Sequence, residues 1–149
     1  MFLRKENVFI DVEVNNTDEL FETIGRRMID GGFAKDGFIQ ALKDREKAFP
    51  TGLPSGDIGV GLPHVDACYV LIPAVAVIRL KKPIQFVMMG SDDTIVDARV
   101  IFMLLLQAGE SQLTMLQKLV DIIQNEDFMQ SILDCDSPIE VFELLKNSI

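Results

Sequence analysis

His64 is the only histidine in the chain, and it follows a short apolar run that ends in a proline. The run, residues 58–62, contains two glycines and precedes Pro63, a pattern typical of a buried strand that ends in a turn. The glycines would allow another group to approach the backbone closely. Because the unperturbed pKa of imidazole lies near neutrality, a histidine in such a turn can act as a base, a ligand or a nucleophile. By residue type alone, a surface histidine without a task is the more frequent case.

A neutral imidazole can also accept a phosphoryl group. One ring nitrogen must then be free, while the other keeps its proton against an acceptor, often a backbone carbonyl. Hydrogen-bond donors or a guanidinium must offset the charge on the phosphoryl oxygens. The nearest such groups in sequence are Arg45, Thr51, Ser55 and the amides of the glycine-rich loop. Spacing does not decide whether they converge on His64, and Arg45 would also suit the last turn of a helix, where a positive charge is favourable.

Other catalytic patterns find little support. The chain contains no G-x-G-x-x-G after a strand, no P-loop, no H-E-x-x-H and no G-x-S-x-G. With one histidine, and with Cys68 and Cys135 far apart, neither a zinc site nor a disulfide framework is expected. Asp92 and Asp93 could hold magnesium, although adjacent acids in a Ser-Asp-Asp loop are usually solvated turn residues. Cys68 could form a nucleophilic pair with His64, but a small half-buried residue is its more frequent role.

Composition narrows the class of protein. The chain has 149 residues, 48% hydrophobic and 25% charged, which suits a single domain over residues 1–149 with a packed core. The formal net charge of -9 argues against non-specific nucleic-acid binding, which needs a positive field. The N-terminus lacks the apolar core of a signal peptide, and the longest apolar stretch, residues 100–106, is too short to span a bilayer. We therefore expect a cytoplasmic protein without membrane insertion.

Local patterns predict two helices and then several strands. Residues 7–14 indicate a short strand or an extended lead-in, and Thr17 suits the N-cap of a helix that would end at Gly31-Gly32. A second helix is expected over residues 35–45, followed by a loop up to Gly56, since that stretch holds two prolines and two glycines. The remaining expected elements are a strand over 72–80, a turn at 81–83, a short edge strand at 84–86 and a long central strand over 96–106.

The C-terminal part reads as helical. Ser111 suits the N-cap of a third helix, and a short helix is expected over 127–133. Ser137-Pro-Ile-Glu140 forms a capping box with proline at the first helical position. Because helices precede and follow the strands, they can cover both faces of one sheet. We therefore predict the α/β class, a sandwich with a mixed β-sheet flanked by helices on both faces.

Two segments carry a resemblance to a known family. Arg45-Glu-Lys-Ala-Phe-Pro-Thr-Gly-Leu53 and Ile58-Gly-Val-Gly-Leu-Pro-His-Val65 resemble the arginine, Pro-Thr-Gly and Pro-His pattern of enzyme IIA proteins of the fructose–mannitol class (EIIA type 2). These proteins belong to the bacterial phosphoenolpyruvate-dependent sugar phosphotransferase system. The resemblance extends over nearly the whole chain, and the combined spacing is specific, whereas a lone Pro-His would be weak.

The resemblance implies a mechanism and partners. Phosphorylated HPr, a small carrier protein, would pass its phosphoryl group to Nε2 of His64, and phosphorylated His64 would donate it to a cysteine of enzyme IIB. The IIB and membrane IIC partners would then phosphorylate a sugar during uptake. Arg45 would steady the phosphoryl oxygens. No metal or other cofactor is implied.

Two departures from the family pattern refine this expectation. Mannitol and fructose members often carry a second active-site histidine before a leucine, and here that step is Gln112-Leu113. Glutamine can donate a hydrogen bond to a phosphoryl oxygen, but it carries neither a charge nor a transferable proton. The chain is therefore more similar to the galactitol-type branch, and galactitol or a similar polyol is the expected sugar. The usual alanine before Leu-Pro-His is Gly61.

Two other functions stay open at this point. A regulatory IIA-like module would use phosphorylation of His64 as a signal to a kinase, a transporter or a transcription factor. A plain structural or binding domain would carry an inert histidine.

Overall fold

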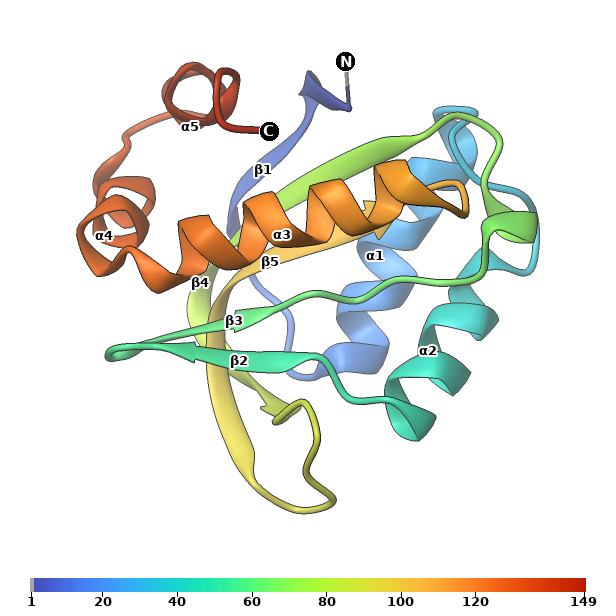
Figure 1. Cartoon of the computed structure of the whole chain (residues 1–149), viewed down its shortest axis with the longest axis horizontal. Helices are drawn as coiled ribbons and strands as arrows, with labels where there is room; N and C mark the ends of the chain where they lie inside the picture. The colour runs from blue at the N-terminus through green and yellow to red at the C-terminus, as the bar shows by residue number, and fades with distance from the viewer. Residues whose placement is uncertain (1) are drawn as a thin grey trace.

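The computed structural model describes residues 2–149, apart from the side chains of Glu110 and Ser111, as a five-stranded sheet between helices (Figure 1). The strand order is β1-β4-β5-β3-β2. The β1–β4 and β3–β5 pairs are parallel, whereas β4–β5 and β2–β3 are antiparallel. The strands are β1 (Leu3–Val12), β2 (Gly52–Ser55), β3 (Ile58–Gly61), β4 (Ala74–Val87) and β5 (Ile95–Leu105). The predicted mixed sheet is therefore confirmed.

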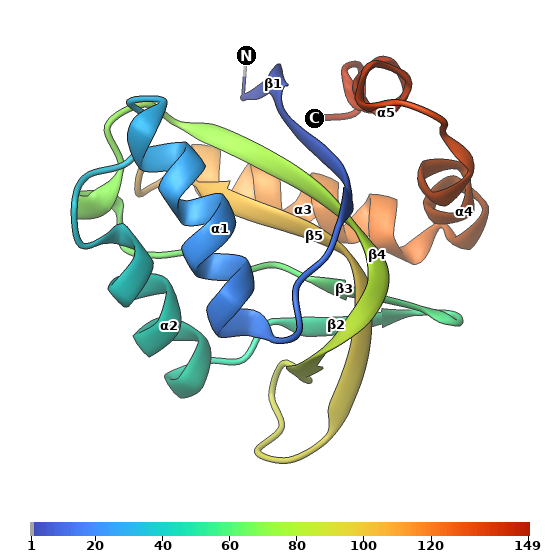
Figure 2. The same cartoon turned by 180° about the vertical axis from the view of Figure 1, so that it is seen from behind.

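Helices cover both faces of this sheet. Helices α1 (Thr17–Asp30) and α2 (Phe38–Ala48) lie on the face seen from the front in Figure 2. Helix α3 (Glu110–Gln124) crosses the opposite face, where α4 (Glu126–Asp134) follows it and α5 (Pro138–Leu145) lies against β1. Side chains alternate along β4, so that Ala76 and Ile78 join the α1–α2 core while Val75 and Val77 join the α3–α5 core.

The strand β5 lies at the centre of the sheet. Residues 100–105 are all buried, with exposed fractions of 0 or 1%. A strand that is covered on both faces reads as a continuous apolar run. The predicted central strand over 96–106 is confirmed with a start at Ile95.

Three local predictions were wrong in whole or in part, for identifiable reasons. The predicted turn at 81–83 lies inside β4, where the register with β5 shifts between Arg79 and Ile84, and Pro83 is tolerated at this irregularity. Residues 84–86 are therefore part of the long strand β4 rather than a separate short strand; they pair with β5, and because the pairing of β4 with β1 ends at Leu80, they lie at the edge of the sheet as predicted. The stretch predicted as a loop up to Gly56 contains β2, which pairs with β3 through a tight turn at Gly56, where φ is 57°.

Helix ends follow local capping chemistry closely. Asn16, not Thr17, caps α1 by accepting a hydrogen bond from the Glu19 amide at 2.9 Å, and Thr17 is the first helical residue. Helix α3 starts after Gly109, earlier than a cap at Ser111 would place it. The cap at Ser137 is confirmed, because its hydroxyl accepts from the Glu140 amide at 3.2 Å.

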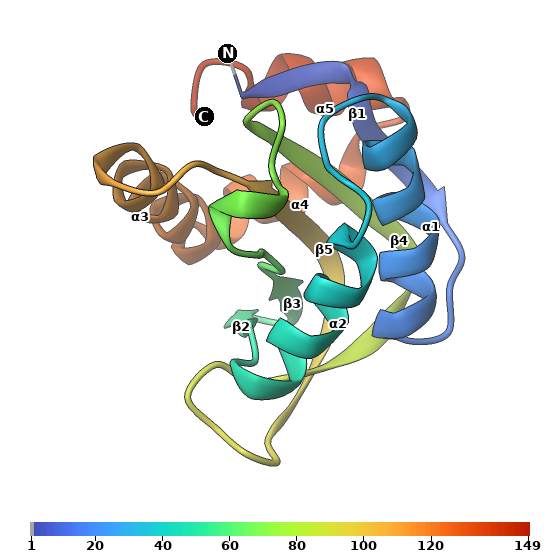
Figure 3. The ribbon, with the colours of Figure 1, turned by 90° about the vertical axis from the view of Figure 1, so that its right-hand side faces the viewer.

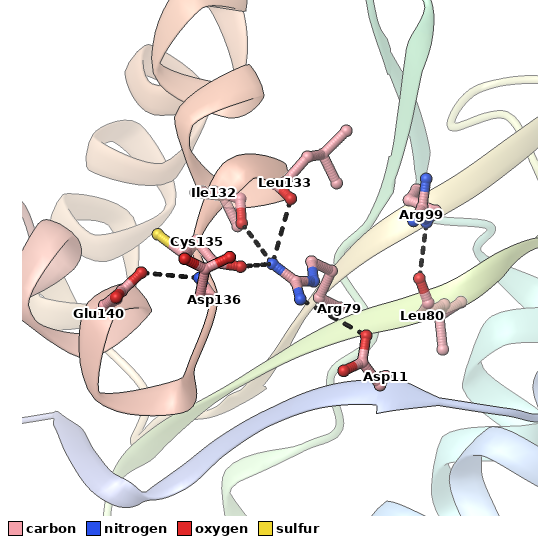
Figure 4. A network of polar contacts seen from close by, with 9 residues as sticks. All are labelled: Asp11, Arg79, Leu80, Arg99, Ile132, Leu133, Cys135, Asp136 and Glu140. Carbon is pink, nitrogen blue, oxygen red and sulfur yellow. Dashed lines mark hydrogen bonds and ion pairs between the residues drawn. The ribbon is translucent and has the colours of Figure 1, made fainter.

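A buried arginine connects α4 to the sheet through hydrogen bonds (Figure 4). Arg79 of β4 is 7% exposed and lies in the face that packs against α3–α5. Its Nη1 donates to the carbonyls of Ile132, Leu133 and Cys135 at 3.1, 3.2 and 2.6 Å, and its Nη2 lies 3.5 Å from Asp11. The guanidinium thus satisfies carbonyls at the C-terminus of α4 that have no partner within the helix.

Candidate functional site

The backbone around His64 is attached to the centre of the sheet. The chain leaves β3 at Gly61, and the carbonyl of Pro63 accepts a hydrogen bond from the amide of Leu104 in β5 at 2.9 Å. His64 itself forms a parallel bridge with Leu104. The imidazole is therefore presented from a rigid strand end, as the apolar run before Pro63 predicts.

One ring nitrogen of His64 is held by the backbone. Nδ1 lies 2.8 Å from the carbonyl oxygen of Leu62. A carbonyl can only accept a hydrogen bond, so Nδ1 carries the proton and the lone pair lies on Nε2. The half-buried ring thus has the arrangement that a nucleophilic histidine needs, with Nε2 as the ring nitrogen left free.

The surroundings keep the imidazole neutral. Burial lowers the pKa of His64 below its usual value, and the charge of Arg45 lowers it further. The hydrogen bond to Leu62 and the charge of Asp66 act in the opposite direction without reversing the shift. The neutral form, which is the nucleophilic one, is therefore favoured at neutral pH.

Arg45 reaches the same region from the last turn of α2. Its Nη1 lies 3.2 Å from Asp66, and its guanidinium lies over the Phe49 ring at 4.9 Å from the centroid. The Nε atom is buried and makes no hydrogen bond within the described residues. Arg45, Phe49 and Asp66 also line one shallow hollow beside the histidine segment. The structure thus brings the predicted arginine into electrostatic range of His64, with one donor unused.

Thr51 supports the site instead of facing it. The side chain is buried, its hydroxyl donates to Glu46 at 2.8 Å, and the same oxygen accepts from the amide of Leu62 at 3.2 Å. The Thr51 amide donates to the other oxygen of Glu46 at 2.7 Å. Glu46 is thus a site residue that the sequence prediction missed, although it directly follows Arg45 in the motif.

Ser55 and the glycines serve packing. The Ser55 hydroxyl donates to the carbonyl of Ile123 in α3, so it does not serve His64. A Cβ atom at Gly59 would lie 2.0 Å from the carbonyl oxygen of Asp97, and one at Gly61 would lie 2.6 Å from the Phe86 ring. The groups that approach these two glycines closely are therefore the backbone of β5 and a side chain of β4.

Gln112 lies in the first turn of α3 and is half-buried. Its backbone N–H donates to the carbonyl of Gly109 at 3.2 Å. Among the described residues its side chain makes no hydrogen bond to His64 or Arg45, and contact with a phosphoryl group remains a prediction for this residue.

The other candidate groups lie apart from this arrangement. Cys68 is exposed in a short 3-10 turn, η1 (Ala67–Tyr69), and Asp92 and Asp93 are exposed between β4 and β5. Within the part of the chain that the structure describes, no three His, Cys, Asp or Glu side chains gather as metal ligands. No helix of residues 2–149 combines the length and apolar character that crossing a bilayer requires.

Comparison with known proteins identifies the class. A sequence model of the family described as "Phosphoenolpyruvate-dependent sugar phosphotransferase system, EIIA 2" matches residues 1–148, and the chain belongs to this family. The family membership supports a role in phosphoryl transfer. The galactitol-specific EIIA component of Escherichia coli (strain K12) is 26% identical over 133 residues, which is 89% of this chain and 85% of that protein.

Solved structures share the fold. The complex of enzyme IIA and phosphorylated enzyme IIB for mannitol from Escherichia coli aligns with a TM-score of 0.79 and 23% identity, over 97% of this chain and 99% of that chain. Nitrogen regulatory protein IIA-Ntr from Neisseria meningitidis aligns with a TM-score of 0.75 and 25% identity, over 97% and 96%. The resemblance on which the sequence prediction rests is confirmed.

Proposed function

We propose that the chain is a phosphocarrier that takes a phosphoryl group from phosphorylated HPr onto Nε2 of His64 and passes it to a cysteine of enzyme IIB. The observation that carries this proposal is the hydrogen bond between Nδ1 of His64 and the Leu62 carbonyl, because it leaves the Nε2 lone pair free. Membership of the EIIA 2 family and the nearby charge of Arg45 support it.

The transfer step balances without a cofactor. The Nε2 lone pair attacks the phosphorus of the donor phosphohistidine, and a new P–N bond forms while the donor's P–N bond breaks. The electron pair of the broken bond returns to the donor nitrogen. Nδ1 of His64 keeps its proton throughout, held by the Leu62 carbonyl. In the second transfer the cysteine thiolate of IIB takes the phosphoryl group, and the electron pair of the P–N bond returns to Nε2.

Arg45 and Gln112 have proposed roles toward the phosphoryl oxygens. The guanidinium of Arg45 has an unused donor at Nε, and its ion pair with the exposed Asp66 contributes little that an anion would have to replace. Fixed positive charge beside the transferred group stabilises its oxygens in the transition state. Gln112 would add a neutral amide donor from the first turn of α3.

The expected sugar is galactitol or a similar polyol. This assignment follows the galactitol-specific relative and the glutamine at position 112. The IIA component itself would contact only proteins, namely HPr and IIB. The sugar would be bound and phosphorylated by IIB and the membrane component IIC.

A regulatory role is the second candidate. The similarity to a nitrogen regulatory protein, at 25% identity over 97% of the chain, supports it. In that case phosphorylation of the same His64 would change the affinity for a protein partner, with no onward transfer to a IIB cysteine.

Labelling with phosphoenolpyruvate, enzyme I and HPr tests both roles. We expect acid-labile phosphate on His64, located by peptide mapping under alkaline conditions, and none on His64→Ala, which should fold normally. Onward transfer to a IIB cysteine would support the transport carrier. Labelling that no IIB accepts would favour the regulatory role, and a folded protein that stays unlabelled would contradict both.

A further inference from the structure

A chain of hydrogen bonds runs from helix α2 to the imidazole of His64. Glu46 accepts from both the amide and the hydroxyl of Thr51, at 2.7 and 2.8 Å. The Thr51 oxygen accepts from the amide of Leu62 at 3.2 Å, and the carbonyl of Leu62 accepts from Nδ1 of His64 at 2.8 Å. The residues come from α2, the position just before β2 and the turn after β3. Four residues thus form one continuous path.

The direction of these bonds is determined by their chemistry. The Thr51 hydroxyl has one proton, and it accepts from Leu62, so its proton points to Glu46. Glu46 must then accept with both oxygens, which suits an ionised carboxylate, because a protonated carboxyl group uses one oxygen as an O–H donor and accepts only weakly there. The polarity of the whole path therefore depends on a carboxylate at position 46.

Leu62 connects the two halves of this path, because its amide is bound by Thr51 and its carbonyl binds His64. The Leu62 amide is held by the hydroxyl and by the carbonyl of Thr51, at 3.2 and 3.3 Å. These two bonds restrict the backbone at Leu62, whose carbonyl points at Nδ1 of His64. The next residue, Pro63, has no amide proton and so adds no backbone donor at this turn. The carbonyl that selects the tautomer of His64 is held in place by groups that do not touch the ring.

The partial burial of the Glu46 carboxylate costs folding free energy. Among the described residues it forms no ion pair, and its hydrogen bonds are those from Thr51. Burial raises the pKa of Glu46, against the two hydrogen bonds from Thr51 that lower it. A carboxylate kept half-buried without a cation is unfavourable for folding, which points to a purpose beyond stability.

We propose that Glu46 is a positioning residue which, through Thr51 and the Leu62 backbone, holds His64 in the Nδ1-protonated tautomer with Nε2 free for the phosphoryl group. This inference rests on the proposed phosphocarrier function for its consequence, the rate of transfer. The tautomer itself is a property of the unphosphorylated protein and can be measured independently.

The test uses nitrogen NMR of the single histidine together with labelling by phosphoenolpyruvate, enzyme I and HPr. In the wild type we expect the Nδ1-protonated tautomer to dominate. Glu46→Gln cannot accept from both Thr51 donors, and Thr51→Val removes the hydroxyl, so both variants should populate the other tautomer and slow labelling about 10–100-fold. Thr51→Ser keeps the hydroxyl and should restore both properties. Glu22→Gln makes the same chemical change on an exposed carboxylate of α1 and should leave both unchanged.

Several results would overturn the proposal. A wild-type spectrum dominated by the Nε2-protonated form would do so without any variant, which keeps the test decisive if Thr51→Val fails to fold. Folded variants with an unchanged tautomer would also do so, even if labelling slows, because the effect would then be merely structural. If the wild type shows the expected tautomer but is not labelled at all, the phosphocarrier function fails while the positioning by Glu46 is still decided by the spectra.

Discussion

At the scale of single residues, the protonation of His64 follows from competing interactions. Burial is the largest cause that lowers the pKa of His64, and the charge of Arg45 lowers it as well. We therefore predict an NMR titration midpoint below the ordinary value of about 6.5. Between the folded and unfolded pKa values the unfolded chain binds more protons. Stability contributed by His64 should therefore rise with pH through this window and be lost as pH falls below it.

The titration has a simple control. Asp66 raises the pKa of His64 and Arg45 lowers it, so Asp66→Asn should move the midpoint further down. Because the chain has one histidine, each spectrum contains a single titrating ring. A midpoint above the ordinary value would contradict the assignment of burial as the dominant cause.

Arg45 should matter for the rate of transfer and little for folding. Its side chain is about one third exposed, and its ion-pair partner Asp66 is 76% exposed, so the pair adds little stability. Loss of a charge that stabilises a transition state typically costs about 10²-fold in rate. We predict such a loss in His64 labelling for Arg45→Ala, measured in single-turnover reactions with phosphorylated HPr. Lys47→Ala, an exposed change in the same helix, is the control, and labelling of Arg45→Ala at the wild-type rate would remove Arg45 from the mechanism.

At the scale of secondary-structure elements, the position of α4 depends on Arg79. Replacement by methionine keeps much of the volume but leaves three carbonyls at the C-terminus of α4 without their donor. We predict a loss of about 2–4 kcal/mol in the free energy of unfolding, measured by urea denaturation. Asp11→Asn should change stability far less, because Asp11 is 68% exposed. Equal effects of the two changes would mean that the ion pair with Asp11 of β1, not the contacts with the α4 carbonyls, accounts for the stability that Arg79 contributes.

At the scale of the whole molecule, charge should govern docking. The chain has a net charge of -9. The exposed residues Asp44 and Asp66 line the hollow beside Arg45. Figure 3 shows the side of the molecule on which α2 and η1 lie. A carrier protein with basic groups would be attracted electrostatically to this acidic surface, and salt shortens the range of that attraction. With limiting HPr, we predict that the initial rate of His64 labelling falls as sodium chloride rises from about 0.05 to 0.5 M. A rate that is independent of salt would argue for a docking surface dominated by apolar contacts.

Much of the fold could be predicted from the sequence because its signals are local. The long apolar run of β5 indicated a strand buried on both faces, and Ser137-Pro-Ile-Glu140 indicated the start of α5. His64 after Pro63 indicated a side chain at a strand end, and the motif with Arg45 indicated the family. Periodicity, capping and a motif all involve residues close together in the chain, so they can be read without coordinates.

The sequence by itself thus determined the class of fold, the phosphoacceptor candidate and its arginine. Only the tertiary structure showed that Glu46, Thr51 and Leu62 form a path to His64, and that Gly59 and Gly61 make room for neighbouring packed groups. It also placed Pro83 inside the long strand β4 and directed Ser55 away from the site. The physical reason is that these contacts join residues brought together by strand pairing and packing, as with Arg45 and Asp66, which lie 21 positions apart. No local pattern of residue types specifies which of many hydrogen-bond donors and acceptors will meet.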